Sequence, residues 1–184
     1  MEYKITTPVK SEDIAMLKAG DKVLLSGIVY TSRDQAHKRM FETIQSNGQL
    51  PFELEGSAIY YVGPTPAPEG RPIGSAGPTT SVRMDAYSPT LLDLGNKVMI
   101  GKGKRSDEVK AAIIRNKAVY LGALGGAGAL MAECIVSSEC IAWPDLGCEA
   151  VYKLTVKDMP LTVTIDSEGN DLYILGPNEY LKTK

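Results

Sequence analysis

Blocks of apolar positions, separated by polar and glycine-containing breaks, predict alternating helices and strands early in the chain. Ser11 followed by two acidic residues is typical of a helix start, and Gly20 predicts the end of that helix. Residues 22–31 are rich in β-branched and apolar side chains and predict a strand. Residues 34–46 repeat apolar positions at helical spacing, up to a stop at Asn47 and the glycine after it. The chain therefore passes directly from a strand into a helix.

A proline- and glycine-rich segment interrupts this pattern after a short buried strand at 58–62. Residues 63–78 contain five prolines and four glycines, which exclude regular helix or sheet. A linker between two domains would have this composition. We expect an ordered loop instead, because the segment before it is too short to stand alone and the segment after it carries the most suggestive residues.

The alternation of helices and strands resumes beyond this loop. The later elements that the pattern predicts are a helix begun by Ser88 and Pro89 and ended by Gly95, strands at 97–101, 118–122 and 138–143, a helix at 106–117 capped by Ser106, a small-residue loop and helix start at 125–135, and an antiparallel strand from 161 with one solvated face. Parallel and antiparallel signals are mixed. The fold class that we predict is α/β with a mixed sheet, in a layered β/β/α arrangement.

Composition limits the size and the partners of the protein. The 184 residues, 43% hydrophobic and 23% charged, suit a single domain over 1–184. The net charge of −2, with basic residues spread out, gives no positive field for nucleic acid or an anionic membrane. The N-terminus does not resemble a signal peptide, and no apolar run approaches the ~18 residues of a membrane span. We expect a soluble, cytoplasmic protein without nucleic-acid or membrane partners.

Three cysteines, Cys134, Cys140 and Cys148, do not suit a disulfide framework. Their number is odd, and the chain shows no export signal. Their spacing, C-x5-C-x7-C, lacks both a further ligand and the short local spacings that are common in cluster sites. We expect all of them to be reduced and buried among small residues.

Hydroxyl and guanidinium groups gather in residues 75–85, SAGPTTSVRMD. If a helical turn starts at Thr79 or Thr80, Thr79 and Arg83 lie four apart on one face, so a hydroxyl and a guanidinium could converge on one ligand. Thr80 and Ser81 would then cap the turn. A helix cap beside a surface arginine explains the same residues. Composition alone does not decide between these interpretations.

Two further segments place charged groups where strands end. In residues 101–106, GKGKRS, the glycines let backbone N–H groups approach an anion and Lys102 adds a positive charge, although a tight turn with solvated lysines would look the same. Arg33 and Asp34 follow a strand at a position where α/β proteins place ligand groups, or they form a salt bridge at a helix start. We expect His37, the only histidine, to serve in packing or capping.

Arg33, Arg83 and Lys102 together predict a site for a small polyanion, with Thr79 as the polar group nearest the reacting centre. Two guanidiniums and an ammonium match a dicarboxylate well. The sequence offers no Ser–His–Asp set and no histidine cluster for a metal. A catalytic function would therefore need groups from elsewhere.

Four segments, in this order, carry a resemblance to a known family: TSRDQAHKR, GPTTSVRMD, GKGKRS, and a C-terminal stretch that runs from GGAGALMAECI to TIDSEGN. They resemble the β subunit of iron–sulfur-dependent hydro-lyases, the class I fumarases and L-tartrate dehydratases. In single-chain fumarases the equivalent region forms the C-terminal domain. The resemblance covers nearly the whole chain from ITTPVKSEDI onward, and it implies a swivelling β/β/α domain.

The resemblance also implies a cofactor and a partner. A [4Fe–4S] cluster would be held by three cysteines of a partner α subunit in an α2β2 heterotetramer, and the cysteines of this chain would take no part. One iron without a protein ligand would act as a Lewis acid on the substrate hydroxyl or on water. The acid partner, an aspartate in fumarases, would also come from the α subunit.

Motif by motif, the resemblance assigns roles to the predicted site residues. Thr79 of GPTT would be the base toward the carbon-bound proton, and Arg83 and Arg33 would bind substrate carboxylates. Lys102 would bind substrate and help Thr79 to ionise. A threonine hydroxyl is a very weak acid, so nearby cations and exclusion of water are physically required for that role.

The loop at Lys102 departs from the family pattern. Fumarases typically carry KGNRS, whereas this chain has Lys104 in place of the asparagine, and tartrate-type β subunits usually carry KGGM. Arg105 and Ser106 favour a fumarase. The function that we predict is the β subunit of a [4Fe–4S]-dependent fumarate hydratase, which interconverts fumarate and malate. The alternatives are L-tartrate dehydratase, which converts tartrate to oxaloacetate, and a non-catalytic dicarboxylate-binding module.

Overall fold

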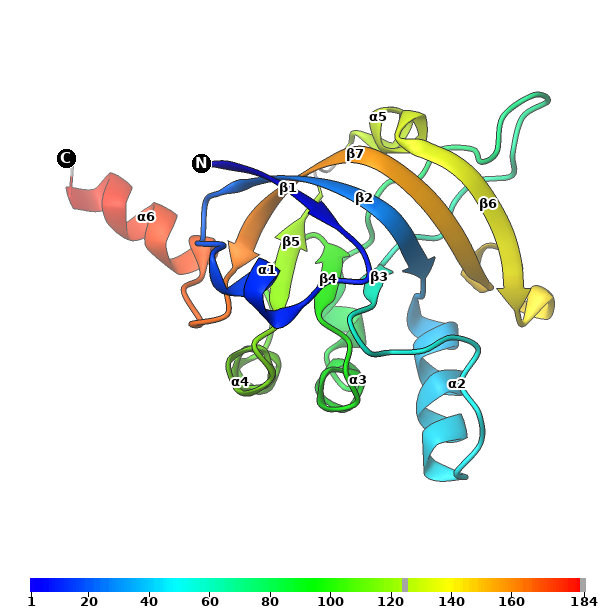
Figure 1. The fold of residues 1–184 in the computed structure, drawn as a ribbon, viewed down its shortest axis with the longest axis horizontal. Helices are drawn as coiled ribbons and strands as arrows, with labels where there is room; N and C mark the ends of the chain where they lie inside the picture. The colour runs from blue at the N-terminus through cyan, green and yellow to red at the C-terminus, as the bar shows by residue number, and fades with distance from the viewer. Residues whose placement is uncertain (124–125, 183–184) are drawn as a thin grey trace.

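The computed structural model describes residues 1–123 and 126–182, and its strands form one mixed sheet. The strands are β1 (Glu2–Thr6), β2 (Lys22–Thr31), β3 (Ala58–Tyr60), β4 (Val98–Gly101), β5 (Val119–Gly122), β6 (Ile135–Ala142) and β7 (Val151–Ile165). The helices are α1 (Ser11–Ala15), α2 (Asp34–Gln45), α3 (Ser88–Asp93), α4 (Asp107–Asn116), α5 (Gly128–Glu133) and α6 (Leu172–Lys182), with 3-10 helices η1 (Ser81–Met84) and η2 (Pro144–Glu149). Figure 1 shows their arrangement.

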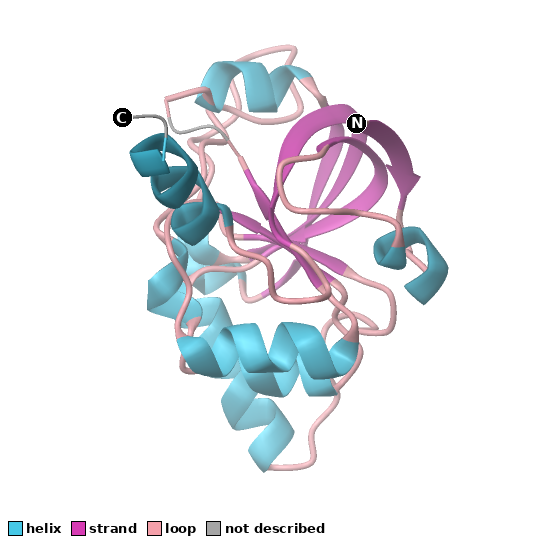
Figure 2. Ribbon diagram, turned by 90° about the vertical axis from the view of Figure 1, so that its left-hand side faces the viewer, coloured by secondary structure: helices cyan, strands magenta, loops and turns pink. Residues whose placement is uncertain are grey.

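The long strands β2 and β7 close the sheet on itself. The strand order is β1-β2-β3-β4-β5-β7-β6, with an additional pairing between β2 and β7. Strand β2 runs parallel to β1 and β3 and antiparallel to β7, and β7 also pairs antiparallel with β5 and β6. Strands β2, β3, β4, β5 and β7 therefore form a closed, barrel-like ring, and Figure 2 shows how the strands curve around it.

Both faces of β3, β4 and β5 are buried, in two separate apolar clusters. Tyr60, Ile100 and Leu121 belong to a cluster that gathers side chains from every ring strand. Their chain neighbours Ile59 and Met99 belong to a second cluster, shared with α2, α3 and α4. Because successive side chains of a strand point to opposite faces, these three short strands are apolar at nearly every position, whereas the longer β2 and β7 keep polar residues at their exposed positions. Figure 1 shows these three helices together below the strands.

Much of the predicted order of elements is confirmed. The chain is α/β with a mixed sheet, and strand β2 covers the predicted residues. Helix α2 ends just before Asn47, which has a left-handed φ of 54°. Helix α4 is capped by Ser106, whose hydroxyl accepts the N–H of Val109. The swivelling β/β/α description stays a prediction.

Other boundaries differ from the prediction. Helix α1 is five residues long and does not reach Gly20. Ser88 is the first residue of α3 rather than its cap, because its buried hydroxyl donates to the carbonyl of Met84. Strand β7 begins ten residues before the predicted position 161, at Val151. Helix α5 lies within the predicted 125–135 segment, whose first residue is outside the described part. Helix α6 was not predicted, because Pro177 interrupts its pattern.

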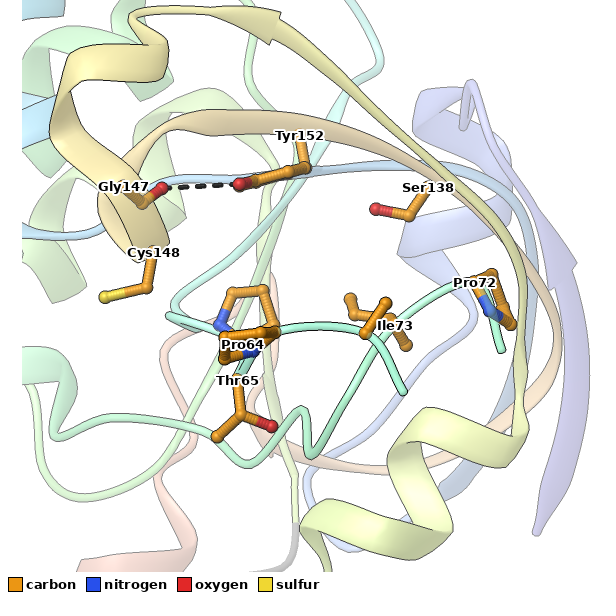
Figure 3. Close-up of a pocket in the computed structure, with 10 residues that line it drawn as sticks. Pro64, Thr65, Pro72, Ile73, Ser138, Gly147, Cys148 and Tyr152 are labelled. Carbon is orange, nitrogen blue, oxygen red and sulfur yellow. Dashed lines mark hydrogen bonds between the residues drawn. The ribbon is translucent and has the colours of Figure 1, made fainter. Parts of the chain in front are cut away.

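The proline-rich segment is an ordered loop, as predicted. Its two arms pair where the N–H of Thr65 donates to the carbonyl of Ser75 at 3.0 Å and the N–H of Gly74 donates back to Thr65 at 3.2 Å. The loop forms one wall of an apolar cavity of about 290 Å³, opposite Tyr152 of β7 and Cys148 of η2 (Figure 3). Within residues 1–123 and 126–182, no helix is long and apolar enough to cross a membrane.

Candidate active site

The topology brings three of the predicted site residues to one edge of the sheet. Arg33 follows β2 and Lys102 follows β4, and β3 lies between these two parallel strands. Thr79 lies beside the end of β3, because its N–H donates to the carbonyl of Tyr61 at 2.8 Å. The carboxyl ends of neighbouring parallel strands meet at one edge, which is where α/β proteins commonly bind ligands.

Thr79 precedes the helical turn instead of starting it. The turn, η1, begins at Ser81, and Thr80 occupies the N-cap position with extended backbone and no side-chain capping bond. The prediction that Thr79 and Arg83 share a helix face is therefore wrong, and so is the prediction that Thr80 and Ser81 cap the turn through their hydroxyls. The half-buried Thr79 is held by sheet-like pairing, which the local spacing of residues does not encode.

Ser81 instead joins the threonine segment to the Lys102 loop. Its buried hydroxyl accepts the N–H of Lys102 at 3.0 Å, and its own N–H donates to the carbonyl of Lys102 at 2.9 Å. Thr80 and Lys102 form a parallel β-bridge at the same place. The backbone of Lys102 is thus fixed relative to Thr79, while its exposed side chain remains free to reach a ligand.

One carboxylate holds the two predicted arginines together. Nε of Arg83 donates to Oδ1 of Asp34 at 2.8 Å, and Nε of Arg33 lies 3.8 Å from Oδ2 of the same residue. Nη2 of Arg33 also lies 3.6 Å from Oε1 of Glu149. The Arg83 side chain is 48% exposed, so its terminal amino groups face solvent beside the partly buried Arg33. Asp34 thus does more than form the predicted salt bridge at the helix start.

The Arg33 side chain lies directly against the backbone of Gly63. A Cβ atom at Gly63 would come within 2.5 Å of Nη1 of Arg33, so only glycine leaves the guanidinium its present place. Nε of Arg33 is buried and has no hydrogen-bond partner among the described residues. The buried Oδ2 of Asp34, 3.8 Å from this Nε, likewise has no hydrogen-bond partner among the described residues, so the two groups face each other as an ion pair without a hydrogen bond.

Lys102 borders a cavity of about 570 Å³ between β4, β5, β7 and the start of α6. Hydroxyl groups from Thr80, Thr162, Thr164 and Tyr173 share its lining with Lys102. Its lining does not include the other predicted site residues. The structure therefore places Lys102 at a cavity that the arginine pair does not line.

His37 is a packing residue, as predicted. Its ring is fully buried, 5.3 Å from the ring of Tyr61, and its Nδ1 lies 3.1 Å from the carbonyl oxygen of Arg33 and 2.7 Å from Oγ of Ser32. Burial lowers the pKa of His37 to about 3, so the ring is neutral at physiological pH. A neutral ring with its proton on Nδ1 donates to the Arg33 carbonyl and so steadies the backbone of that arginine.

The sequence interpretation gave Arg105 no structural role. Its side chain is fully buried between the rings of Tyr61 and Tyr120, where it forms an ion pair with Asp85 at 2.7 Å. Burial opposes the charge, but Tyr61, Asp85 and Tyr120 outweigh it and raise the pKa of Arg105. The sequence did offer a signal for a structural role, because Arg105 directly precedes the helix cap Ser106 in the KGKRS motif. A guanidinium at that place has backbone and carboxylate partners within reach.

The cysteines are not buried, contrary to the prediction. Cys134 is half-buried, whereas Cys140 and Cys148 are exposed. Cys140 lies in β6, which is at the edge of the sheet and pairs with β7 alone among the described strands, so solvent reaches most of its side chains. In the part of the chain that the structure describes, no three His, Cys, Asp or Glu residues are grouped so as to hold a metal ion. These donors therefore do not fit an iron–sulfur cluster.

Comparison with known proteins agrees with this arrangement of segments. The family model "Fumarase C-terminus" matches residues 2–175. The chain belongs to this family. It is 40% identical to "Fumarate hydratase class I, anaerobic" of Escherichia coli over 177 residues, which is 94% of the chain but 32% of that protein. It is 38% identical to "Fumarate hydratase 2" of Leishmania major, with 88% of the chain and 29% of that protein covered.

A further relative has nearly the same length as this chain. The "Putative L(+)-tartrate dehydratase subunit beta" of Methanocaldococcus jannaschii is 38% identical over 179 residues, which is 94% of the chain and 91% of that protein. The chain thus spans about a third of the length of the fumarate hydratases that it matches, but nearly the full length of a β subunit. Relatives of both kinds are named for adding or removing water.

Proposed function

We propose that this chain is the β subunit of a fumarate hydratase, acting as one domain that binds a small dicarboxylate and completes an active site with a partner α subunit. The observation that carries the proposal is the pairing of Arg33 and Arg83 on Asp34, beside Thr79 and the Lys102 loop. The 40% identity to a class I fumarate hydratase supports this reaction over other uses of an anion site.

In this proposal the two guanidiniums bind substrate carboxylates. The half-exposed guanidinium of Arg83 and the partly buried guanidinium of Arg33 would provide the donors for these carboxylates. Asp34 and Glu149 keep the arginines in place in the free protein and reduce the repulsion between them. The three cations of the proposed site still outnumber these two carboxylates, so the site keeps a net positive charge that favours a dianion.

Thr79 would move the proton on carbon. Dehydration of malate removes a proton from one carbon and hydroxide from the next, and hydration of fumarate reverses both steps. The Thr79 alkoxide would take the carbon-bound proton, and the positive charges of Lys102 and the arginines would favour its ionisation. The backbone bond from Thr79 to Tyr61 holds the hydroxyl at the strand end during both directions of the reaction.

The [4Fe–4S] cluster that the resemblance implies would belong to the partner, since the cysteines of this chain do not fit one. The partner would make up the roughly two thirds of a fumarate hydratase that this chain does not span. An α2β2 heterotetramer in the cytoplasm is the assembly that we propose.

L-Tartrate dehydratase is the second candidate, and one specific observation favours it. A tartrate dehydratase β subunit is among the relatives of this chain, and the similarity extends over 91% of that protein. Malate and tartrate differ by one hydroxyl, so the same carboxylate clamp would serve either substrate. The choice between them depends on groups that contact the second hydroxyl.

The test is turnover in an anaerobically reconstituted complex with a cluster-bearing α subunit, with malate, fumarate and L-tartrate as substrates. Thr79→Ala should lower kcat by several orders of magnitude, whereas Thr79→Ser, which keeps the hydroxyl, should retain measurable activity. Arg83→Met should chiefly raise KM. Near-normal turnover of Thr79→Ala removes the proposed base, and tight dicarboxylate binding by the isolated chain would instead favour a non-catalytic binding module.

A further inference from the structure

Arg105 is a buried cation that contacts several of the segments around the proposed site. Its Nε donates to Oδ1 of Asp85 at 2.7 Å, and its Nη2 donates to Oγ of Ser88 at 2.8 Å. Its guanidinium carbon lies 5.2 Å from the centre of the Tyr61 ring and 5.0 Å from that of Tyr120, within the range of cation–π attraction. One side chain therefore joins the end of η1, the start of α3, the end of β3 and strand β5.

The Asp85 carboxylate extends this connection to both functional segments. While its Oδ1 accepts from Arg105, its Oδ2 accepts the N–H of Ser106 at 2.6 Å. Asp85 lies two residues after Arg83, and Ser106 closes the loop that begins at Lys102. A single carboxylate thus ties the turn that carries one proposed substrate group to the loop that carries the other.

Tyr120 completes the connection on the other side of the loop. The ring that packs on Arg105 carries a hydroxyl that hydrogen-bonds to Oγ of Ser81 at 2.9 Å and to the carbonyl of Gly103 at 3.1 Å. Ser81 in turn accepts the N–H of Lys102. The guanidinium, the phenol and the serine form one continuous set of contacts beneath the loop.

We infer that Arg105 is a positioning residue, which together with Asp85 holds Lys102 and Arg83 at a fixed distance and orientation. Arg105 cannot touch a substrate, since its side chain is fully buried. Lysine cannot replace it, because one ammonium cannot make two directed bonds in a plane and also stack between two rings. The inference rests on the proposed function, in which Lys102 and Arg83 bind the dicarboxylate.

Amide hydrogen exchange on the chain measures the position of the loop without any reaction. We compare the wild type with Arg105→Lys and Arg105→Met. The N–H groups of Lys102 and Ser106 should exchange about tenfold faster or more in both variants, while those of the β2–β7 ladder keep their rates. Wild-type exchange at Lys102 and Ser106 in folded variants would overturn the inference.

Kinetics of the reconstituted complex separate positioning from stability. With Arg105→Lys, kcat per folded complex should fall on the order of 100-fold while KM changes much less, because the charges that attract the dicarboxylate remain but their geometry is lost. Leu154→Ala is the matched control, since it removes buried side-chain volume in the apolar cluster within the ring. An equal loss of kcat in Leu154→Ala, measured well below both melting temperatures, would show a general stability effect and contradict the inference.

A milder variant keeps the test decisive if the Arg105 variants do not fold. Ser88→Ala removes the partner of Nη2, together with the bonds of that hydroxyl to Met84 and Tyr61, but it leaves the Asp85 pair and both ring contacts of Arg105. It should give a smaller change of the same kind in both exchange and kcat. A wild-type complex that turns over none of the three substrates refutes the proposed function, yet the exchange rates still decide whether Arg105 holds the loop. If the wild-type complex turns over its substrate normally and the variants keep wild-type exchange rates and kcat, the positioning role is refuted while the proposed function stands.

Discussion

At the scale of single residues, a small set of polar contacts determines where each charge of the proposed site lies. Asp34 serves two arginines, Gly63 leaves space for one of them, and His37 supports its backbone. Each of these residues can be changed without altering a proposed substrate group. Their effects on binding and on stability can therefore be separated.

Gly63→Ala should displace the Arg33 guanidinium. The added Cβ would lie 2.5 Å from Nη1 of Arg33, and the flexible end of that side chain is what must move. We expect KM for the dicarboxylate to rise about tenfold, the equivalent of ~1.4 kcal/mol, with little change in melting temperature. Gly77→Ala is the control, since its Cβ would meet only the Cα of Gly128 at an ordinary 3.5 Å. Equal KM values for the two variants would contradict this account of Gly63.

His37 should make the free energy of unfolding depend on pH even above the pH range in which the carboxylates titrate. Burial lowers the folded-state pKa to about 3, whereas the unfolded ring has its usual value of 6.5, so the unfolded state binds an extra proton between these values. Stability should therefore fall as the pH drops, by about 1.5 kcal/mol from pH ~6.5 to ~5. Urea unfolding at the two pH values measures this.

His37→Asn provides the control for the pH experiment. The chain has a single histidine, so the variant should lose most of the dependence in this window. Carboxylates with lowered pKa values, such as Asp21 and Asp166, lose their contribution only at more acid pH. An unchanged slope in His37→Asn would place the titrating group elsewhere.

At the scale of elements, helix α4 connects the Lys102 loop to the rest of the fold. Ser106 begins the helix at the loop, and Lys117 ends it with a left-handed backbone, φ 48° and ψ 48°. The sequence pattern identified both ends but not the conformation of Lys117. Non-glycine residues adopt this conformation at a cost, which glycine avoids.

Lys117→Gly should raise the free energy of unfolding by about 0.5–1 kcal/mol, because it relieves the left-handed backbone at the end of α4. Ala111→Gly, at an exposed position inside the same helix, should lower it by about 1 kcal/mol. Thermal or urea unfolding of both variants measures whether the free energy of unfolding changes in these opposite directions. A lower free energy of unfolding in Lys117→Gly would contradict this account. It would show that the Lys117 side chain stabilises the protein by more than the left-handed backbone destabilises it.

At the scale of the whole molecule, the proposed site lies at an edge of the ring, and the proposed function takes its remaining groups from a second chain. The chain covers about a third of a class I fumarate hydratase and nearly all of a tartrate dehydratase β subunit. Cys140 and Cys148 are exposed and Cys134 is half-buried, so solvent access does not argue against a cluster at these thiols. Their separation from any grouped metal ligands in the described chain is the relevant feature.

Replacement of Cys134, Cys140 and Cys148 by serine should leave the iron and sulfide content of the reconstituted complex unchanged. The reason is that these thiols are not grouped with other potential ligands in the described residues. Iron and acid-labile sulfide per complex, measured beside the wild type, provide the test. A loss of iron in proportion to the number of substitutions would assign the cluster to this chain.

The sequence by itself determined the order of most elements between Lys22 and Ile165, the ends of α2 and α4, and the choice of residues for the proposed site. These follow from local signals: β-branched runs, a serine cap, an Asn-Gly stop, and motifs shared with a family. Only the tertiary structure decided which residues meet. Asp34 and Arg83 are 49 positions apart, and β2 pairs with β7 far along the chain. Such contacts depend on the closure of the sheet, and the spacing of residues within one element does not contain that information.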